Sequence, residues 1–262
     1  MKAIFLGRKP YSCEALKYLI SKGVDVVAVV AKLDDEDIYW KTKLSDVAKE
    51  YNLNVINDDY LYNAIDNPDN NTLKIDLNNI DIVISYLYWK KIKKTLIDIP
   101  TSGCINFHPA PLPELRGVGG YNVAILEGKR YYGVSAHFVD EKLDSGDIIE
   151  VKRFDIDPYN ETAFSLEQKS QEAMFELFRK IIDNLLEGKE LPRSKQSKGR
   201  YVNKNEFNEL REIKPSDTQE IINRKIRAFW YPPHHGAYLM INDTEYTIID
   251  TKVLKEIGKK YH

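Results

Sequence analysis

The sequence is poor in cysteine and has no long hydrophobic run. Its 262 residues include two cysteines, Cys13 and Cys104, too few for a disulfide framework and typical of a reducing compartment. No stretch approaches the roughly 18 apolar residues of a membrane span, and the first apolar run meets a charge at Arg8, too early for a signal peptide. We therefore expect a soluble, cytoplasmic protein without a membrane partner.

An excess of charge of one sign is also missing. Lysine and arginine total 38 against 40 aspartate and glutamate, a formal net charge of -2. General nucleic-acid binding needs a surface that neutralises phosphates, so no nucleic-acid partner is expected. The sequence has no Cys-x-x-Cys and no histidine pair at metal-ligand spacing, and this predicts no metal site.

What the sequence has is an alternation of buried strands and helices. Residues 3–6, 24–31, 80–85 and 103–107 are continuous apolar runs, typical of strands buried on both faces. Helical spacing over 15–20 separates the first two, so parallel pairing with a right-handed crossover follows. The fold class predicted is α/β, a doubly wound and mostly parallel sheet. Further segments are expected as a helix over 43–51, a short strand over 54–56, and strands over 132–139 and 147–154.

The clearest helix carries an apolar stripe from Leu166 to Leu186 and ends at Gly188. Ser165 and Gln168 have the spacing of a capping box at its start. Beyond about residue 191 the composition becomes polar and basic, as in a linker, and alternating runs around 242–243 indicate a hairpin. We therefore expect a catalytic domain over 1–192 and a small C-terminal region over 193–262 with a helix and a β-hairpin. The edge strands of that hairpin favour a homodimer.

The segment CINFHPAPLPELRGVGG (104–120) is the strongest candidate for a functional site. Asn106 and His108 lie two apart at the end of a predicted strand, so their side chains share one face. The prolines that follow fix the backbone, and open α/β sheets bind ligands at this edge. Asp144, in the turn DEKLDSGD (140–147), could present a carboxylate to His108; a solvated turn is the alternative.

This set contains no serine or cysteine nucleophile. An imidazole can move a proton near neutral pH, and an amide can donate to a developing oxyanion, but an acyl-enzyme would need a nucleophile. Direct transfer of an acyl group between two bound molecules fits the set best.

The first strand-to-helix turn, GRKPYS (7–12), lacks the Gly-x-Gly-x-x-Gly spacing of dinucleotide-binding folds. A nicotinamide or flavin enzyme is therefore not expected. The turn does place Arg8 and Lys9 at a helix N-terminus, where backbone donors favour phosphate. The alternative is that both side chains are simply solvated.

NFHPAPLPELRG followed by DEKLDSGDII resembles the N10-formyltetrahydrofolate-dependent formyltransferases over residues 2–189. The resemblance implies that Asn106, His108 and Asp144 are the catalytic set and that N10-formyltetrahydrofolate is the formyl donor. The segment SYLYWKKI (85–92) matches the family's folate-binding loop. The folate contacts implied are Tyr86, Leu87, Tyr88, Asp140 and Leu143.

The aromatic segment KIRAFWYPPHHGAYLMI (225–241) resembles the C-terminal part of sugar N-formyltransferases, which act on nucleotide-linked amino sugars for surface polysaccharides. A 4-amino-4,6-dideoxy sugar is the acceptor favoured by this resemblance. We place the amino sugar beside the glycines of RGVGGYN and its pyrophosphate near the first turn, while Trp230 and Tyr231 either stack on a ring or plug the core. The substrate contacts expected are Arg8, Lys9, Pro109, Arg116, Gly117, Gly119, Gly120, Tyr121, Trp230 and Tyr231. The alternatives are a methionyl-tRNA formyltransferase or another folate-dependent formyltransferase, and then a non-catalytic folate- or nucleotide-binding module.

Overall fold

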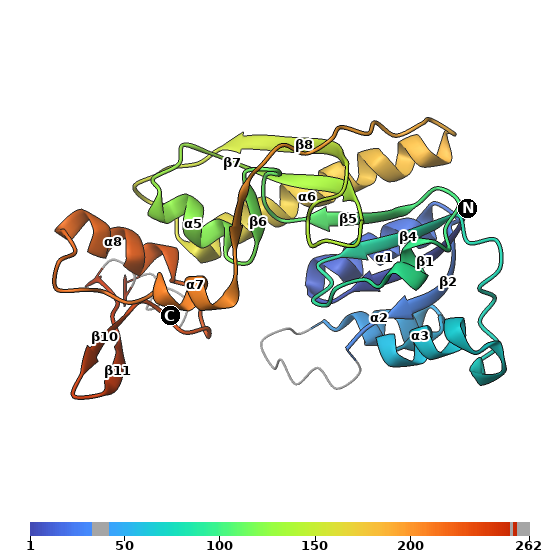
Figure 1. The fold of residues 1–262 in the computed structure, drawn as a ribbon, viewed down its shortest axis with the longest axis horizontal. Helices are drawn as coiled ribbons and strands as arrows, with labels where there is room; N and C mark the ends of the chain where they lie inside the picture. Colours follow the sequence, from blue (N-terminus) through green and yellow to red (C-terminus); the bar gives the residue numbers. More distant parts are fainter. Residues whose placement is uncertain (33–41, 252–253, 256–262) are drawn as a thin grey trace.

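A seven-stranded sheet forms the centre of the molecule, in the order β3-β2-β1-β4-β5-β7-β8 (Figure 1). The computed structural model describes residues 1–32, 42–251 and 254–255. The strands are β1 (Lys2–Gly7), β2 (Asp25–Val30), β3 (Val55–Ile56), β4 (Ile82–Tyr86), β5 (Cys104–His108), β7 (Tyr131–Phe138) and β8 (Ile148–Asp155). Pairing is parallel from β3 to β5 and antiparallel where β7 joins β5 and β8 joins β7. The predicted fold class, a mostly parallel α/β sheet, is confirmed.

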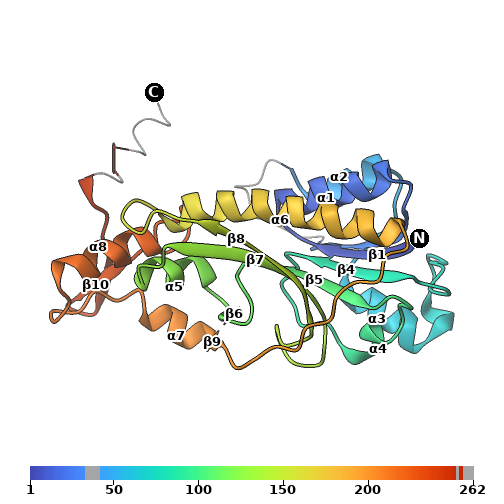
Figure 2. The ribbon, with the colours of Figure 1, turned by 90° about the horizontal axis from the view of Figure 1, so that it is seen from above.

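Helices cover both faces of the sheet (Figure 2). One face packs against α1 (Pro10–Ser21), α2 (Leu44–Glu50) and α6 (Ala163–Leu186) in the largest hydrophobic cluster. The other packs against α3 (Asp58–Asp66) and α4 (Lys94–Ile97). A 3-10 turn, η1 (Pro68–Asn70), follows α3. Burial on both faces explains why the parallel strands read as continuous apolar runs.

The long helix α6 begins earlier than its sequence suggests. Its N-cap is Thr162, whose hydroxyl accepts from the backbone N–H of Ser165 at 3.1 Å, while the Ser165 hydroxyl accepts from the N–H of Thr162 at 3.0 Å. The capping box expected at Ser165 and Gln168 is therefore wrong. Because serine, like glutamine, can serve as the reciprocal partner, the box starts one turn earlier.

The C-terminal region shares a hydrophobic core with the sheet domain. β9 (Arg200–Val202) pairs in parallel with β6 (Leu115–Gly117), and α8 (Gln219–Ala228) packs on α5 (Gly120–Leu126). One hydrophobic cluster joins buried residues of both regions, among them Ala110, Val123, Tyr132, Val202, Ile226 and Phe229. A further helix, α7 (Lys204–Glu209), and the hairpin of β10 (Tyr238–Ile241) and β11 (Thr244–Thr247) complete the fold. Across the described ranges, no helix has both the length and the apolar character that a bilayer crossing requires.

Candidate active site

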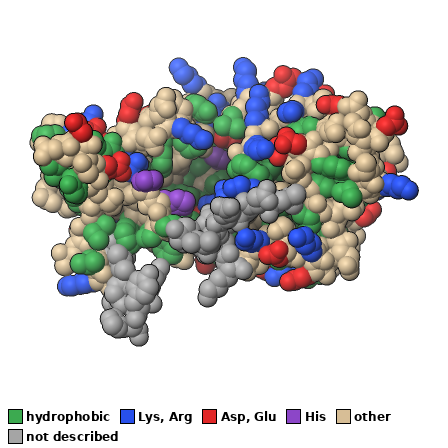
Figure 3. Space-filling model, turned by 90° about the horizontal axis from the view of Figure 1, so that it is seen from below, with side chains coloured by type: hydrophobic (Ala, Val, Ile, Leu, Met, Phe, Trp, Pro, Cys, Tyr) green, Lys and Arg blue, Asp and Glu red, His purple; other side chains and the backbone are tan. Residues whose placement is uncertain are grey.

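A cavity of about 680 Å³ opens at the carboxyl ends of β4 and β5. Its walls come from the loop after β4, the end of β5 and the segment after it, the turn between β7 and β8, and the end of β9 with the residues that follow it. Figure 3 shows a hollow across the middle of this face with histidine, lysine and arginine side chains around it. Asn106, His108, Asp144 and His137 all line the cavity.

The Asn106 amide is held in one orientation. The Ser85 hydroxyl, opposite Asn106 on β4, donates to its Oδ1 at 2.7 Å. On the other side of β5, His137 is the register partner of Asn106, and Nδ2 lies 3.1 Å from His137 Nε2. An amide nitrogen carries two hydrogens, so one remains for a ligand after the bond to His137.

His137 completes this arrangement as a neutral imidazole. Its Nδ1 donates to the carbonyl oxygen of Phe138 at 2.7 Å, which leaves Nε2 as the acceptor for Asn106. Burial lowers the pKa of His137 to about 4; positive charge at His108 adds to this effect and Asp144 opposes it. His137 was missed at the sequence level, although it belongs to the predicted strand 132–139; only the β5–β7 register reveals its place.

Asp144 lies between the two histidines. Its Oδ1 is 3.7 Å from His108 Nδ1 and 3.8 Å from His137 Nε2, and both distances are longer than a hydrogen bond. Its Oδ2 accepts from the backbone N–H of Gly117 at 3.0 Å. Gly117 has a φ of 82°, a left-handed conformation that glycine adopts without strain.

One ring nitrogen of His108 is hydrogen-bonded to the backbone, and the other faces Asp144. Nε2 lies 3.2 Å from the carbonyl oxygen of Leu115, which can only accept. In the neutral ring the hydrogen therefore sits on Nε2, and the lone pair on Nδ1 faces the Asp144 carboxylate. His108 can therefore accept a proton at Nδ1, and the Asp144 carboxylate would then lie beside the positive charge.

Gln196 supports the turn that contains Asp144, a role that the sequence did not indicate. Gln196 Nε2 donates to the backbone carbonyls of Asp144 and Gly146 at 3.1 and 2.7 Å. Its Oε1 accepts from Arg116 Nη2 at 2.7 Å. Arg116, expected as a substrate contact, thus points to Gln196 and the Ser197 carbonyl. The segment expected as a linker supplies this support.

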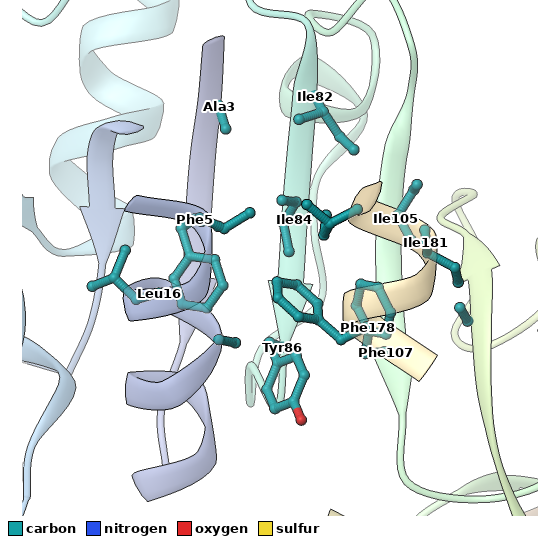
Figure 4. Close-up of a cluster of buried hydrophobic side chains, with 14 of the residues drawn as sticks. Ala3, Phe5, Leu16, Ile82, Ile84, Tyr86, Ile105, Phe107, Phe178 and Ile181 are labelled. Carbon is teal, nitrogen blue, oxygen red and sulfur yellow. The ribbon is translucent and has the colours of Figure 1, made fainter. Parts of the chain in front are cut away.

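The predicted folate contacts divide into two groups. Leu87, Tyr88, Asp140 and Leu143 line the cavity. Tyr86 is fully buried and lies in the core, with its ring 5.7 Å from that of Phe107 and 5.4 Å from that of Phe178 (Figure 4). Tyr86 therefore supports the site from beneath and does not form its wall.

The glycines after Arg116 do not all leave open space. Gly117 lines the cavity, as does Pro109. A side chain at Gly119 would meet the Phe207 ring, at 2.3 Å, and one at Gly120 would meet the Tyr132 hydroxyl at 2.6 Å. The expectation that these two glycines make room for a sugar is wrong at both positions, because neighbouring aromatic residues fill that room.

The remaining predicted substrate contacts are spread along the edge of the site. Lys9 lines the cavity, and its ammonium is bound to Glu167 at 2.6 Å. The Arg8 guanidinium lies over the Trp89 ring, 5.9 Å from its centroid. Trp230 packs against the shared core, whereas Tyr231 and Tyr121 line a neighbouring cavity.

Comparison with known families gives a match over most of the chain. The family model described as formyl transferase matches residues 1–182. A methionyl-tRNA formyltransferase of Syntrophomonas wolfei is 28% identical over 98% of this chain and 81% of its own length. One of Bacillus mycoides is 32% identical over 72% of this chain, which spans 60% of that relative.

Solved structures show the same fold. A 4-N formyltransferase from Francisella tularensis has a TM-score of 0.75 at 23% identity, covering 95% of this chain and 96% of its own. An N-formyltransferase from Helicobacter canadensis, solved with folinic acid and dTDP-3-aminofucose, has a TM-score of 0.72 at 23% identity, covering 94% of this chain and 86% of its own. Both likenesses extend into the C-terminal region.

Proposed function

Because this chain belongs to the formyl transferase family, we propose that it transfers a formyl group from N10-formyltetrahydrofolate to the amine of a nucleotide-linked amino sugar. The observation that carries the proposal is the convergence of Asn106, His108 and Asp144 in one cavity. The catalytic roles implied by the sequence resemblance require this proximity. The favoured acceptor remains a 4-amino-4,6-dideoxy sugar.

The walls of the cavity suit a folate. Leu87, Tyr88 and Leu143 offer apolar surface, and Asp140 and Lys142 offer polar groups in the same cavity. A volume of about 680 Å³ lies in the range of ligand sites in proteins. The Helicobacter canadensis structure with folinic acid supports the assignment of the donor.

In the proposed reaction the acceptor's neutral amine attacks the formyl carbon. The free hydrogen of Asn106 Nδ2 donates to the formyl oxygen as negative charge develops there, while Ser85 and His137 keep the amide from turning. His108 Nδ1 receives the proton that the amine loses. The Asp144 carboxylate, 3.7 Å away, stabilises the resulting imidazolium. The C–N bond between the formyl carbon and the folate nitrogen then breaks, and the His108 imidazolium returns its proton to that nitrogen as it leaves.

Substitution of the three residues tests these roles. We expect Asn106→Ala to lower the rate about 10²–10³-fold through loss of an oxyanion donor, and His108→Ala about 10²–10⁴-fold through loss of the base. Asp144→Ala should also lower the rate, because the imidazolium loses its anion. Folinic acid binding, measured by calorimetry, should persist in all three variants.

Glu141 gives a matched control for Asp144, because it is an exposed acid in the same turn. Glu141→Ala should keep both turnover and folate binding. Full activity in all three site variants would refute the assigned roles.

The acceptor is tested by mass spectrometry of the reaction products. The protein is incubated with N10-formyltetrahydrofolate and a panel of nucleotide-linked amino sugars, glycinamide ribonucleotide and charged initiator tRNA. A gain of one formyl group on a sugar supports the proposal and identifies the acceptor. The 28% identity with a methionyl-tRNA formyltransferase over 98% of the chain makes tRNA the second candidate. Formylation of tRNA alone would refute the sugar acceptor and keep the chemistry.

A further inference from the structure

The segment between α6 and β9, residues 187–199, returns along the sheet to the catalytic cavity (Figure 2). Near its middle, Ser194 forms an antiparallel bridge with Ile148 at the start of β8, and each backbone N–H donates to the other residue's carbonyl oxygen, at 2.8 and 2.9 Å. At its far end, β9 pairs in parallel with β6. Gln196 lies between these two attachments, beside the turn that carries Asp144.

The turn at Asp144 has a backbone conformation that other contacts must hold. Asp144 has a φ of 51°, in the left-handed region that residues other than glycine seldom occupy. The turn also lies close to the end of β7, because a side chain at Gly146 would come within 1.9 Å of the Phe138 carbonyl oxygen. A backbone of this kind persists where neighbouring groups fix it.

The Gln196 amide fixes the backbone of this turn. Its Nε2 donates to the carbonyl oxygens of Asp144 at 3.1 Å and of Gly146 at 2.7 Å, which uses both amide hydrogens. Its Oε1 accepts from Nε and Nη2 of Arg116, at 3.1 and 2.7 Å. Because a guanidinium only donates and a carbonyl oxygen only accepts, this orientation of the amide is the one that satisfies both sides.

Arg116 belongs to β6, and this three-residue strand holds both members of the His108–Asp144 pair. The Leu115 carbonyl oxygen lies 3.2 Å from His108 Nε2, and the Gly117 N–H donates to Asp144 Oδ2 at 3.0 Å. Arg116, between them, binds the amide that holds the Asp144 backbone. The imidazole and the carboxylate are therefore positioned by one short strand, directly and through that amide.

We infer that Gln196 is a positioning residue for proton transfer, which keeps the Asp144 carboxylate beside His108. The inference rests on the proposed function, in which this carboxylate stabilises the His108 imidazolium. The attraction weakens as the two groups separate, so a turn released from Gln196 would stabilise the imidazolium less than the present separation of 3.7 Å allows. Gln196 is not one of the described residues that line the cavity, so it acts through Asp144 and not through contact with a ligand.

The donor-facing part of the same turn has hydrogen bonds of its own. Asp140 Oδ1 accepts from the backbone N–H of Lys142 at 3.0 Å and from the Ser145 hydroxyl at 2.6 Å. Loss of the Gln196 amide should therefore displace Asp144 and leave the proposed folate wall in place. The inference thus predicts a lower kcat with little change in the affinity for folate.

Two substitutions separate this role from attachment of the segment alone. Gln196→Met has a side chain of similar length and makes none of these hydrogen bonds. Gln196→Glu keeps an oxygen that accepts from Arg116, so the segment stays attached, but it places a second oxygen against the two carbonyl oxygens of the turn. A role limited to attachment would tolerate Gln196→Glu, whereas a role in holding the turn would not.

Kinetics and calorimetry measure the two variants. Both should lower kcat for formyl transfer about tenfold or more, as for other small displacements of catalytic groups. Their affinity for folinic acid should stay close to that of the wild type. Lys195→Met, at the exposed neighbouring position, is the matched control and should change neither quantity.

Nuclear magnetic resonance of the histidine side chains gives a readout that needs no acceptor. The chain has five histidines, and the signals of His108 are identified by their loss in His108→Gln. We expect these signals to move in Gln196→Met and in Gln196→Glu in the same direction as in Asp144→Asn. In Lys195→Met they should stay in place.

A double substitution tests whether the effect passes through Asp144. In the Asp144→Asn background, Gln196→Met should lower kcat much less than it does in the wild type. Unchanged His108 signals in Gln196→Met, wild-type kcat in that variant, or an undiminished effect beside Asp144→Asn would each overturn the inference. A wild-type protein that formylates none of the acceptors would refute the proposed function instead, and the histidine signals would still show whether Gln196 places Asp144.

Discussion

His137 is a buried histidine whose neutral form matters for the site. Its Nδ1 donates a hydrogen bond to the Phe138 carbonyl oxygen, so in the neutral ring its Nε2 accepts from Asn106 Nδ2. A proton on Nε2 would face the Asn106 amide hydrogen and turn the amide away from the oxygen that we propose it binds. Burial, which lowers the pKa of His137 to about 4, therefore also protects the orientation of Asn106.

This pKa predicts an acid-dependent loss of stability. In the unfolded chain the histidine takes up a proton as the pH falls through about 6.5, whereas in the folded protein it stays neutral until about 4. The unfolded state therefore binds more protons in this window, and stability falls as the pH falls from about 6.5 to 4. Between pH 7.5 and 5 the expected loss from this group is roughly 2 kcal/mol, measured by urea unfolding.

His137→Gln serves as the comparison, because glutamine does not titrate. Its free energy of unfolding should lack this part of the pH dependence, whatever its value at pH 7.5. An equal slope against pH in the variant and the wild type would contradict the argument.

At the scale of elements, helix α6 connects the sheet with the cavity beside the active site, because it packs on the sheet and its residues Ala163 and Glu167 line that cavity. The position of its N-cap therefore matters for the site. Thr162 and Ser165 satisfy each other's backbone N–H groups, while Gln168 is exposed.

Two alanine substitutions distinguish the observed cap from the one expected from the sequence. Thr162→Ala should destabilise the protein by about 1 kcal/mol, because the N–H of Ser165 loses its acceptor. Gln168→Ala should change stability by less than about 0.5 kcal/mol, as for other exposed positions. Urea unfolding at neutral pH measures both. A larger effect at Gln168 than at Thr162 would show that the helix begins at the later position.

At the scale of the whole molecule, the hairpin β10–β11 projects from the body (Figure 1). It forms a two-stranded sheet of its own, an arrangement that is marginally stable alone. Met240, Ile241 and Tyr246 on it are 47%, 52% and 50% exposed. The sequence-based expectation of a homodimer through this hairpin remains a prediction, and these exposed apolar side chains are its physical basis.

Substitutions that place a charge on the hairpin test the predicted dimer. Ile241→Lys and Tyr246→Lys should shift the protein from dimer to monomer, because lysine carries a hydrated charge into the contact. Light scattering after size-exclusion chromatography measures the mass. Tyr159→Lys, on an exposed residue after β8, should leave the dimer intact. A wild-type protein that is monomeric at all concentrations would refute this assembly.

Local sequence patterns were enough to predict the features that depend only on neighbouring residues. Continuous apolar runs predicted the buried parallel strands, and the Asn-x-His spacing at the end of one strand placed Asn106 and His108 on one face. Both follow from the geometry of a single strand, in which alternate side chains share a side. Short elements such as β6, β9 and α5 were not predicted, because three to seven residues carry too little periodicity.

Contacts between residues that are distant in the sequence could not be predicted in this way. His137 faces Asn106 through the β5–β7 register, and Gln196 reaches the Asp144 turn from beyond α6. Trp230 and Tyr231 are neighbours in the chain, yet one packs in the core and the other lines a cavity. Such choices depend on how elements from different parts of the chain fill space against each other, and no local pattern encodes that packing.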